Sequence, residues 1–167
     1  KNLINKYHPK VNVHICGKIN EPLLTKEKFS KESYFTAIFD QQIFIDYNKK
    51  LLKTCQKLSK KLKLKLNIRL HPANFADDYS FDKDNYINRD IYRSKFIVGH
   101  TSSMIFEVMR FDIPVFKLKS IIPSNEIDSS LIFENYDDLL LKVKNLNSFD
   151  FMSVWRSMSA KRSNIST

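Results

Sequence analysis

The sequence predicts an α/β fold: a Rossmann-like, mainly parallel sheet with helices on both faces. Short apolar runs rich in β-branched and aromatic residues alternate along the chain with longer segments in which apolar residues recur at helical spacing. The chain has 167 residues, of which 43% are hydrophobic, so it can bury one substantial core. Strands that alternate with helices favour parallel pairing, because each helix returns the chain to the same end of the sheet.

Five segments have the composition of buried strands, and four have helical periodicity. The predicted strands are 34–39, 64–70, 96–98, 115–118 and 131–133. The predicted helices are 43–62, 102–111, 136–146 and a last helix beginning at Phe151. A short helical turn is expected within 90–95, and 73–88 is expected to be a loop. Residues 34–160 form the predicted domain, 1–33 (with a strand-like pattern at 11–16) a linker or the remnant of a preceding domain, and 161–167 a tail.

The chain carries a net charge of +10, much of it from a lysine run between residues 49 and 65. One interpretation is a solvated helix face. The other is attraction to an anionic partner, such as a nucleotide, an acidic glycan, nucleic acid or an anionic membrane surface. Lysine replaces arginine in this run and no aromatic residue interrupts it, which argues against a dedicated single-stranded nucleic-acid surface. An anionic membrane surface is therefore kept as a partner, and no specific nucleic acid is expected.

The cysteines and the apolar runs indicate a cellular compartment. Cys16 and Cys55 lack the spacing of a metal or redox motif, so both are expected to be reduced thiols of a cytosolic protein. No apolar run approaches the ~20 residues that a membrane span needs, and no signal segment is visible. The expected location is the cytoplasm.

Polar clusters follow three of the predicted strands, at the point where each strand ends. They are 40–42 (Asp-Gln-Gln), 71–72 (His-Pro) and 99–103 (Gly-His-Thr-Ser-Ser). In open parallel sheets, ligands bind beyond the carboxyl ends of the strands, where the strand order reverses. We therefore expect the three clusters to share one edge of the sheet and to form a ligand site there.

The cluster that begins at Gly99 has the composition of a phosphate-binding turn. Gly99 is expected to let the backbone turn sharply, while Thr101, Ser102 and Ser103 can cap the next helix or donate hydrogen bonds to a phosphate. An ordinary helix cap without a ligand is the alternative. Glu107 lies one helical turn further on, where it can accept hydrogen bonds from a ribose diol or simply face solvent.

Two histidines and two aspartates are candidates for proton transfer and charge stabilisation. His71, at a strand end beside a proline, can donate to a phosphate or assist a leaving phosphate, and His100 is a similar candidate. The alternative for His71 is a turn histidine that hydrogen-bonds only the backbone. Asp40 and Asp46 flank the start of helix 43–62, and either could act as a general base. For Asp46, a first-turn charge that complements the helix dipole is the favoured alternative.

Known metal and cofactor motifs do not fit this chain. Neither an HxxxH pair nor a cysteine ligand pattern occurs. The two glycines are too few for a GxGxxG turn, and they lie too far apart in the chain for a Walker loop. Neither a metal nor a resident cofactor is predicted.

Taken together, these motifs resemble the C-terminal, donor-binding half of a GT-B glycosyltransferase. The pairing of an HP motif with a Ser-Ser motif is similar to that of bacterial sialyltransferases and polysialyltransferases. The resemblance covers about residues 34–146, and the segments that carry it are 69–72 (Arg-Leu-His-Pro), 99–107 (Gly-His-Thr-Ser-Ser-Met-Ile-Phe-Glu) and 113–115 (Ile-Pro-Val).

The resemblance implies a role for several residues. His71 would meet the phosphate of a CMP-sugar, Ser102 and Ser103 would grip the same phosphate, and Glu107 would match the nucleotide-facing carboxylate. It further implies transfer of sialic acid or a related sugar to a glycan acceptor of the bacterial surface, such as capsule or lipooligosaccharide. The transfer would need no metal. It would take place in the cytoplasm or at the inner face of the membrane.

The chain also departs from the family pattern. The Asp-Gly or Glu-Gly element expected upstream of the HP motif is absent, which leaves Asp40 and Asp46, neither followed by glycine, as candidates for the base. The acceptor domain is not recognisable in 1–33, so the isolated donor half is expected to bind nucleotide weakly and not to turn over. Two alternatives stay open: a CDP-glycerol-type glycerophosphotransferase of wall polymer synthesis, and a non-catalytic basic domain that binds polyanions.

Overall fold

The structure is a computed structural model that describes residues 33–80, 86–87, 90–122 and 127–164, with side chains at all of these except 86–87 and 159–164. The strand-like pattern at 11–16 and the interpretation of 1–33 as a linker fall almost entirely outside the described residues. Cys16 does so as well.

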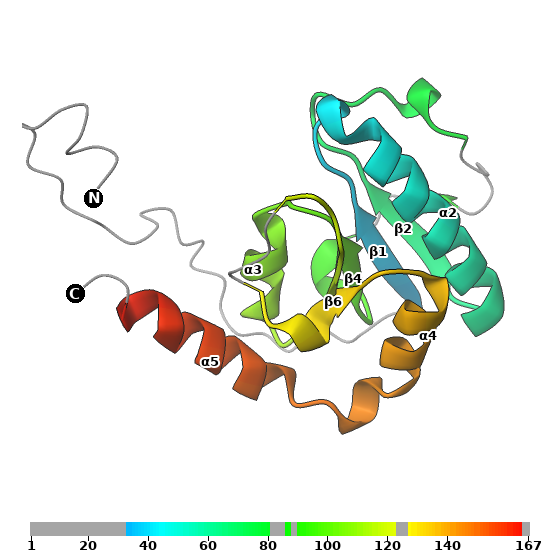
Figure 1. Cartoon of the computed structure of the whole chain (residues 1–167). Coiled ribbons are helices and arrows are strands. Elements are labelled where there is room, and N and C mark those ends of the chain that lie inside the picture. The colour runs from blue at the N-terminus through cyan, green and yellow to red at the C-terminus, as the bar shows by residue number, and fades with distance from the viewer. Residues whose placement is uncertain (1–32, 81–85, 88–89, 123–126, 165–167) are drawn as a thin grey trace, which may run out of the picture.

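Within the described residues, six parallel strands form one sheet, which confirms the predicted fold class. Figure 1 shows the central strands of this sheet with the helices around them. The strands of the sheet are β1 (Tyr34–Ile38), β2 (Lys65–Arg69), β3 (Tyr86–Ile87), β4 (Ile97–Gly99), β5 (Val115–Leu118) and β6 (Ile132–Phe133). Their order across the sheet is β3-β2-β1-β4-β5-β6. The chain therefore builds outward from β1 in one direction and from β4 in the other. This order is shared by doubly wound nucleotide-binding folds, and its switch point lies between β1 and β4.

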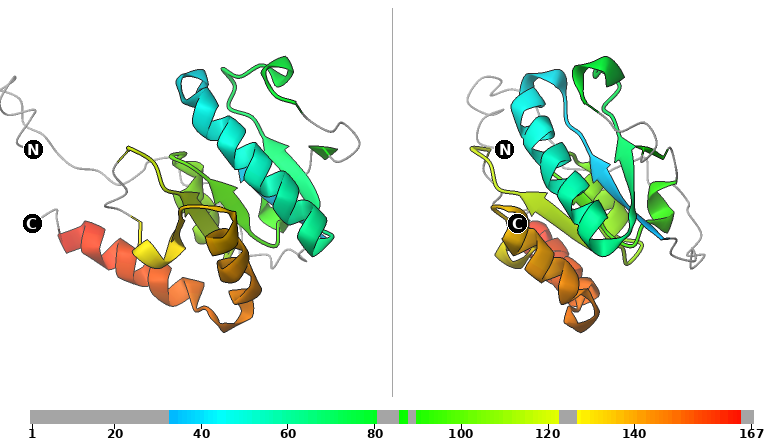
Figure 2. Two further views of the ribbon diagram at one scale, coloured as in Figure 1. Left: turned by 45° about the vertical axis from the view of Figure 1, so that its right-hand side comes forward. Right: turned by 90° about the vertical axis from the view of Figure 1, so that its right-hand side faces the viewer.

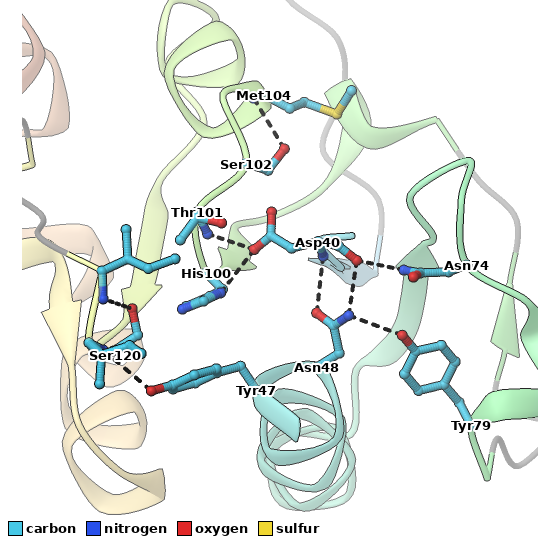
Figure 3. Close-up of polar contacts among 12 residues, drawn as sticks. Asp40, Tyr47, Asn48, Asn74, Tyr79, His100, Thr101, Ser102, Met104 and Ser120 are labelled. Atoms are coloured by element: carbon cyan, nitrogen blue, oxygen red, sulfur yellow. Dashed lines mark hydrogen bonds and ion pairs between the residues drawn. The ribbon is translucent and has the colours of Figure 1, made fainter. Parts of the chain in front are cut away.

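The helices cover both faces of this sheet. They are η1 (Gln42–Phe44), α2 (Ile45–Leu62), α3 (Met104–Met109), α4 (Tyr136–Lys144) and α5 (Phe151–Asn164). Because crossovers between parallel strands are right-handed and leave β1 and β4 in opposite directions, α2 and α3 lie on opposite faces. Figure 3 shows these two helices on either side of the strand ends. Helix α4 contacts α2, and α5 contacts α3. In both views of Figure 2, α4 and α5 lie toward the β6 end of the sheet.

Apolar side chains at the predicted positions make the core. The central strand β1 is buried at all five positions, as expected for a strand covered on both faces. The inner side of α2 contributes Leu51, Cys55 and Leu58, each fully buried. Cys55 is a free thiol whose pKa is raised by burial, which agrees with the expected reduced core cysteine.

Polar side chains are also buried within the sheet layer. Asn67 Nδ2 donates a hydrogen bond to Thr36 Oγ1 at 2.9 Å, and Thr36 Oγ1 lies 2.6 Å from Ser94 Oγ. All three side chains are almost fully buried. This chain of hydroxyl and amide groups links β1, β2 and the segment before β4, and each of its members has a partner, as buried polar groups require.

Several element boundaries differ from the predicted ones by a few residues, and the larger differences have a structural reason. The helix predicted over 102–111 is shorter, because Asp112 takes a left-handed φ of 57° and Pro114 follows. Strand β3 lies within 73–88, which was wrongly predicted to be entirely loop. A strand of two residues is too short to leave a detectable pattern in the sequence. The turn expected within 90–95 is confirmed as η3 (Ile91–Arg93), in which the Tyr92 N–H donates to Asp90 Oδ1. Helix α5 continues to Asn164 and so includes part of the predicted tail, 161–167.

Candidate functional site

Side chains from the ends of three neighbouring strands meet around Asp40, at the carboxyl edge of the sheet (Figure 3). The Thr101 N–H donates to Asp40 Oδ2 at 2.7 Å, and His100 Nδ1 lies 3.1 Å from the same oxygen. Asn74 Nδ2, from the loop after β2, donates to the Asp40 carbonyl at 2.6 Å. Because the strands are parallel, the three predicted clusters follow strand ends at one edge. Asp40 contacts the 99–103 cluster directly, but it reaches the loop after β2 through Asn74 and not through the predicted residues 71–72.

Asn48, on the inner face of α2, holds the backbone of Asp40 in place. Its Oδ1 accepts from the Asp40 N–H at 3.0 Å, and its Nδ2 donates to the Asp40 carbonyl at 3.0 Å and to the Tyr79 hydroxyl at 3.0 Å. The side chain is fully buried. Sequence reasoning missed Asn48 and Asn74. The available signal for Asn48 was a polar residue on the apolar stripe of α2, where a buried amide must find partners.

The surroundings of Asp40 keep its carboxylate ionised. Burial by itself raises the pKa of this carboxyl group, but the hydrogen bonds from His100 and from Thr101 outweigh burial, so the pKa is lowered from its ordinary value. A carboxylate with a lowered pKa is a weaker proton acceptor. These contacts favour Asp40 as a positioning residue of the edge rather than as the general base.

His100 is fully buried and stacks on Tyr47, with ring centroids 4.5 Å apart and an interplanar angle of 11°. Phe44 meets the same imidazole edge-on. The Asp40 carboxylate can only accept a hydrogen bond, so His100 Nδ1 carries the proton that is donated to it. Nε2 is buried and has no hydrogen-bond partner among the described residues. Asp40 thus fixes the orientation of the imidazole, and the rings of Tyr47 and Phe44 pack against it.

Residues 101–103 form the turn between β4 and α3, and part of this turn is free to bind. Ser102 Oγ accepts from the Met104 N–H at 3.3 Å. This is the helix-capping role that was predicted as the alternative to phosphate binding. In the described part of the chain, neither the N–H groups of Ser102 and Ser103 nor the Ser103 hydroxyl takes part in a hydrogen bond. Ser103 is exposed and Ser102 is half-buried. The Ser102 hydroxyl accepts one hydrogen bond and still has its own O–H to donate. Two N–H groups and two hydroxyls are therefore available as donors at the switch point of the sheet.

Gly99 has a different role from the one expected. Its φ is not positive, so the turn after β4 does not need the conformational freedom of glycine. A Cβ at this position would lie 2.9 Å from Ile105 Cδ1 and 3.2 Å from Ile105 Cγ1. Glycine fits here because the Ile105 side chain of α3 packs directly against the end of β4, and a larger residue would displace that side chain.

His71 lies in the loop after β2, at the same edge as Asn74. Its Nδ1 accepts from the Ala73 N–H at 3.1 Å, and its carbonyl accepts from the Asn74 N–H at 2.9 Å. Since Nδ1 is an acceptor, the proton of the neutral ring sits on Nε2, which can donate to a ligand. The side chain is half-buried. The backbone contact predicted as the alternative role is therefore present, and it leaves the other nitrogen in the donor state that phosphate binding requires.

The other two predicted acidic residues lie on helices. Glu107 is half-buried in α3. Asp46 is exposed in the first turn of α2, where its charge complements the helix dipole, the alternative that the sequence favoured.

A buried lysine near the site was also missed. Lys117, on β5, is paired in register with Gly99 and is 4% exposed. Burial lowers the pKa of its ammonium group, and the charge of Asp40 opposes this shift. The sequence signal was a single cation inside the apolar run of β5. A lysine there adds positive charge beside the switch point, where an anionic ligand would benefit from it.

In the described ranges, no group of three or more His, Cys, Asp or Glu side chains is placed to hold a metal ion. No protein-family model matches this chain, and no curated protein sequence is significantly similar to it.

Proposed function

We propose that this chain is the donor-binding domain of a GT-B-type glycosyltransferase that binds a CMP-sugar, with sialic acid or a related sugar as the transferred group. The observation that carries the proposal is the position of the free donors of Ser102 and Ser103 at the point where the strand order reverses. His71 Nε2 belongs to the same edge, across β1 from these serines.

The expected reaction is a direct displacement. An acceptor hydroxyl attacks the anomeric carbon of the sugar, the bond from that carbon to the phosphate oxygen breaks, and CMP leaves. Negative charge develops on the departing phosphate, where His71 and the serine donors stabilise it. The acceptor proton passes to a carboxylate base, for which Asp46 and Asp40 are the predicted candidates. Asp40 has the weaker case because its pKa is lowered.

Nucleotide binding by the chain tests this proposal. We expect CMP to raise the melting temperature more than UMP or AMP at the same concentration. The single pyrimidine ring distinguishes CMP from AMP, and the exocyclic amine distinguishes it from UMP. Replacing two hydroxyl donors in Ser102→Ala/Ser103→Ala should weaken CMP binding by about 10-fold to 100-fold, the range of one or two charge-assisted hydrogen bonds. Ser129→Ala, at an exposed serine of η4 (Ser129–Leu131), is the matched control.

A second variant isolates the backbone donor. Ser103 has a φ of −61°, which proline accepts, so Ser103→Pro removes one free N–H without strain in φ at that residue. We expect Ser103→Pro to bind CMP more weakly than Ser103→Ala. The proposal fails if no cytidine nucleotide stabilises the protein, or if all serine variants bind CMP as the parent does.

His71 provides the catalytic test. In the enzyme with its acceptor domain, His71→Ala should lower the rate of sugar transfer by orders of magnitude while the fold stays intact, because His71 acts on the departing phosphate. Sugar release from the donor, followed with labelled substrate, measures this. A fully active His71→Ala enzyme would exclude the assignment.

A further inference from the structure

Six lysines of α2 lie on one side of the helix. At about 100° per residue they fall within an arc of about 120°, and they span about 18 Å of helix length. They are Lys49, Lys50, Lys53, Lys57, Lys60 and Lys61. The residues that α2 buries against the sheet, such as Leu51, Cys55 and Leu58, occupy the opposite side. We call these six lysines the lysine face.

All six side chains of the lysine face are exposed. None of them makes an ion pair with any carboxylate that the structure describes. Asp46, in the first turn, is the single acidic residue of α2. Lys63 and Lys65, both exposed, continue the positive charge beyond the end of the helix. The face therefore has one sign of charge and no internal neutralisation.

This arrangement carries a cost within the folded protein. Lys49 and Lys53, and Lys53 and Lys57, are spaced by four residues, where like charges repel and destabilise a helix. A salt-bridged surface helix would place glutamates at such positions. An anionic partner removes the repulsion, so charge complementarity points to a densely negative surface.

We propose that the lysine face binds the surface of a bilayer that contains anionic phospholipids, with α2 parallel to that surface. One side of a straight helix presents its charges close to one plane, which matches a plane of headgroups. The face has neither arginine for bidentate phosphate recognition nor an aromatic residue for base stacking, the features that favour nucleic acid. No helix of the described residues is long and apolar enough to span a membrane, so the contact proposed here is peripheral.

Vesicle co-sedimentation tests this proposal and does not depend on the proposed nucleotide site. The chain should bind vesicles of phosphatidylcholine with about 30% phosphatidylglycerol and not vesicles of phosphatidylcholine alone, and binding should weaken as salt is raised. In Lys53→Gln/Lys57→Gln/Lys60→Gln, the partition coefficient for anionic vesicles should fall on the order of 100-fold, because each surface lysine contributes about fivefold. Glutamine has nearly the helix propensity of lysine, so the helix is preserved.

A control variant removes the same number of lysines elsewhere. Lys95→Gln/Lys119→Gln/Lys144→Gln changes three exposed lysines outside α2 and should keep most of the binding. Equal loss in both variants would mean that only net charge matters, and would overturn the proposal. It is likewise overturned if the chain does not bind anionic vesicles, or if it binds a 20-base-pair DNA duplex more tightly than the vesicles and loses that binding in the first variant.

Discussion

Asp40 shows how one side chain organises the candidate site. Its Oδ2 accepts from both the His100 ring and the Thr101 N–H, while its backbone is held by Asn48 and Asn74. These partners come from three segments of the chain: helix α2, the loop after β2 and the turn after β4. The carboxylate therefore acts as a fixed anchor between the ends of β1 and β4, and the position of the 101–103 turn depends on it.

The lowered pKa of Asp40 makes protein stability depend on pH. Because the folded protein binds this proton less readily than the unfolded chain, Asp40 stabilises the native state at neutral pH. The contribution is lost as the pH falls from the ordinary carboxyl pKa of 3.8 through the lower value of the folded state. We expect Asp40→Asn to lower stability at pH 7 and to flatten the decline below about pH 4, measured by urea unfolding across pH.

Asp46→Asn is the matched control for this measurement, since it removes the same charge from an exposed first-turn position. Asp46→Asn should keep the acid decline that Asp40 causes, because it leaves the hydrogen bonds at Asp40 Oδ2 in place. If Asp40→Asn kept the acid decline of the parent, the hydrogen bonds at Oδ2 would not be the source of the pH dependence.

At the scale of elements, the contact between β4 and α3 fixes where the turn 101–103 lies. Ile105, in the first turn of α3, is 1% exposed and fills the space that a Cβ of Gly99 would need. We expect Gly99→Ala to lower the free energy of unfolding by about 1–3 kcal/mol through overpacking. Chemical denaturation measures this loss.

Ile105→Val provides the partner for a double-mutant cycle. It removes Cδ1, the atom nearest to the new methyl group, so the double variant Gly99→Ala/Ile105→Val should be more stable than the sum of the single effects predicts. Simple additivity would show that the cost of Gly99→Ala arises in the backbone of the turn and not in this contact.

At the scale of the whole molecule, a row of phenylalanine rings joins the sheet to the C-terminal helix. Phe35 stacks on Phe96 at 4.7 Å, Phe96 meets Phe116 at 6.1 Å, and Phe116 meets Phe151 at 5.9 Å. These rings connect β1, the start of β4, β5 and the first residue of α5. They make the core continuous from the centre of the sheet to the start of α5.

We expect Phe96→Ala to cost about 3–5 kcal/mol, because Phe96 is 1% exposed and contacts two other rings of this row. Phe75→Ala is the control, since Phe75 is 73% exposed, and its effect should stay within about 0.5 kcal/mol. Urea unfolding of both variants measures the difference. A similar loss in both would mean that the aromatic row does not support the fold as described.

The order of the α-helices and strands along the chain follows from local pattern alone, with the exception of β3. A strand buried on both faces, such as β5, is a continuous apolar run in the sequence. A helix buried on one side, such as α2, has apolar residues at helical spacing. The shared edge of the polar clusters was also predictable, because parallel strands bring their carboxyl ends together. The lysine face could be located as a charge run in α2, but only the packed helix shows which sides of α2 are buried and which are free.

What the tertiary structure alone decided is which groups pair with one another. Asn48 and Asn74 hold Asp40 through hydrogen bonds between residues 8 and 34 positions apart, and such pairings have no period to detect in one sequence. The role of Gly99 likewise depends on Ile105 of α3, because the Ile105 side chain lies where a Cβ at position 99 would be. Local patterns fix what each segment becomes, whereas partners distant in the chain are chosen only when the segments pack.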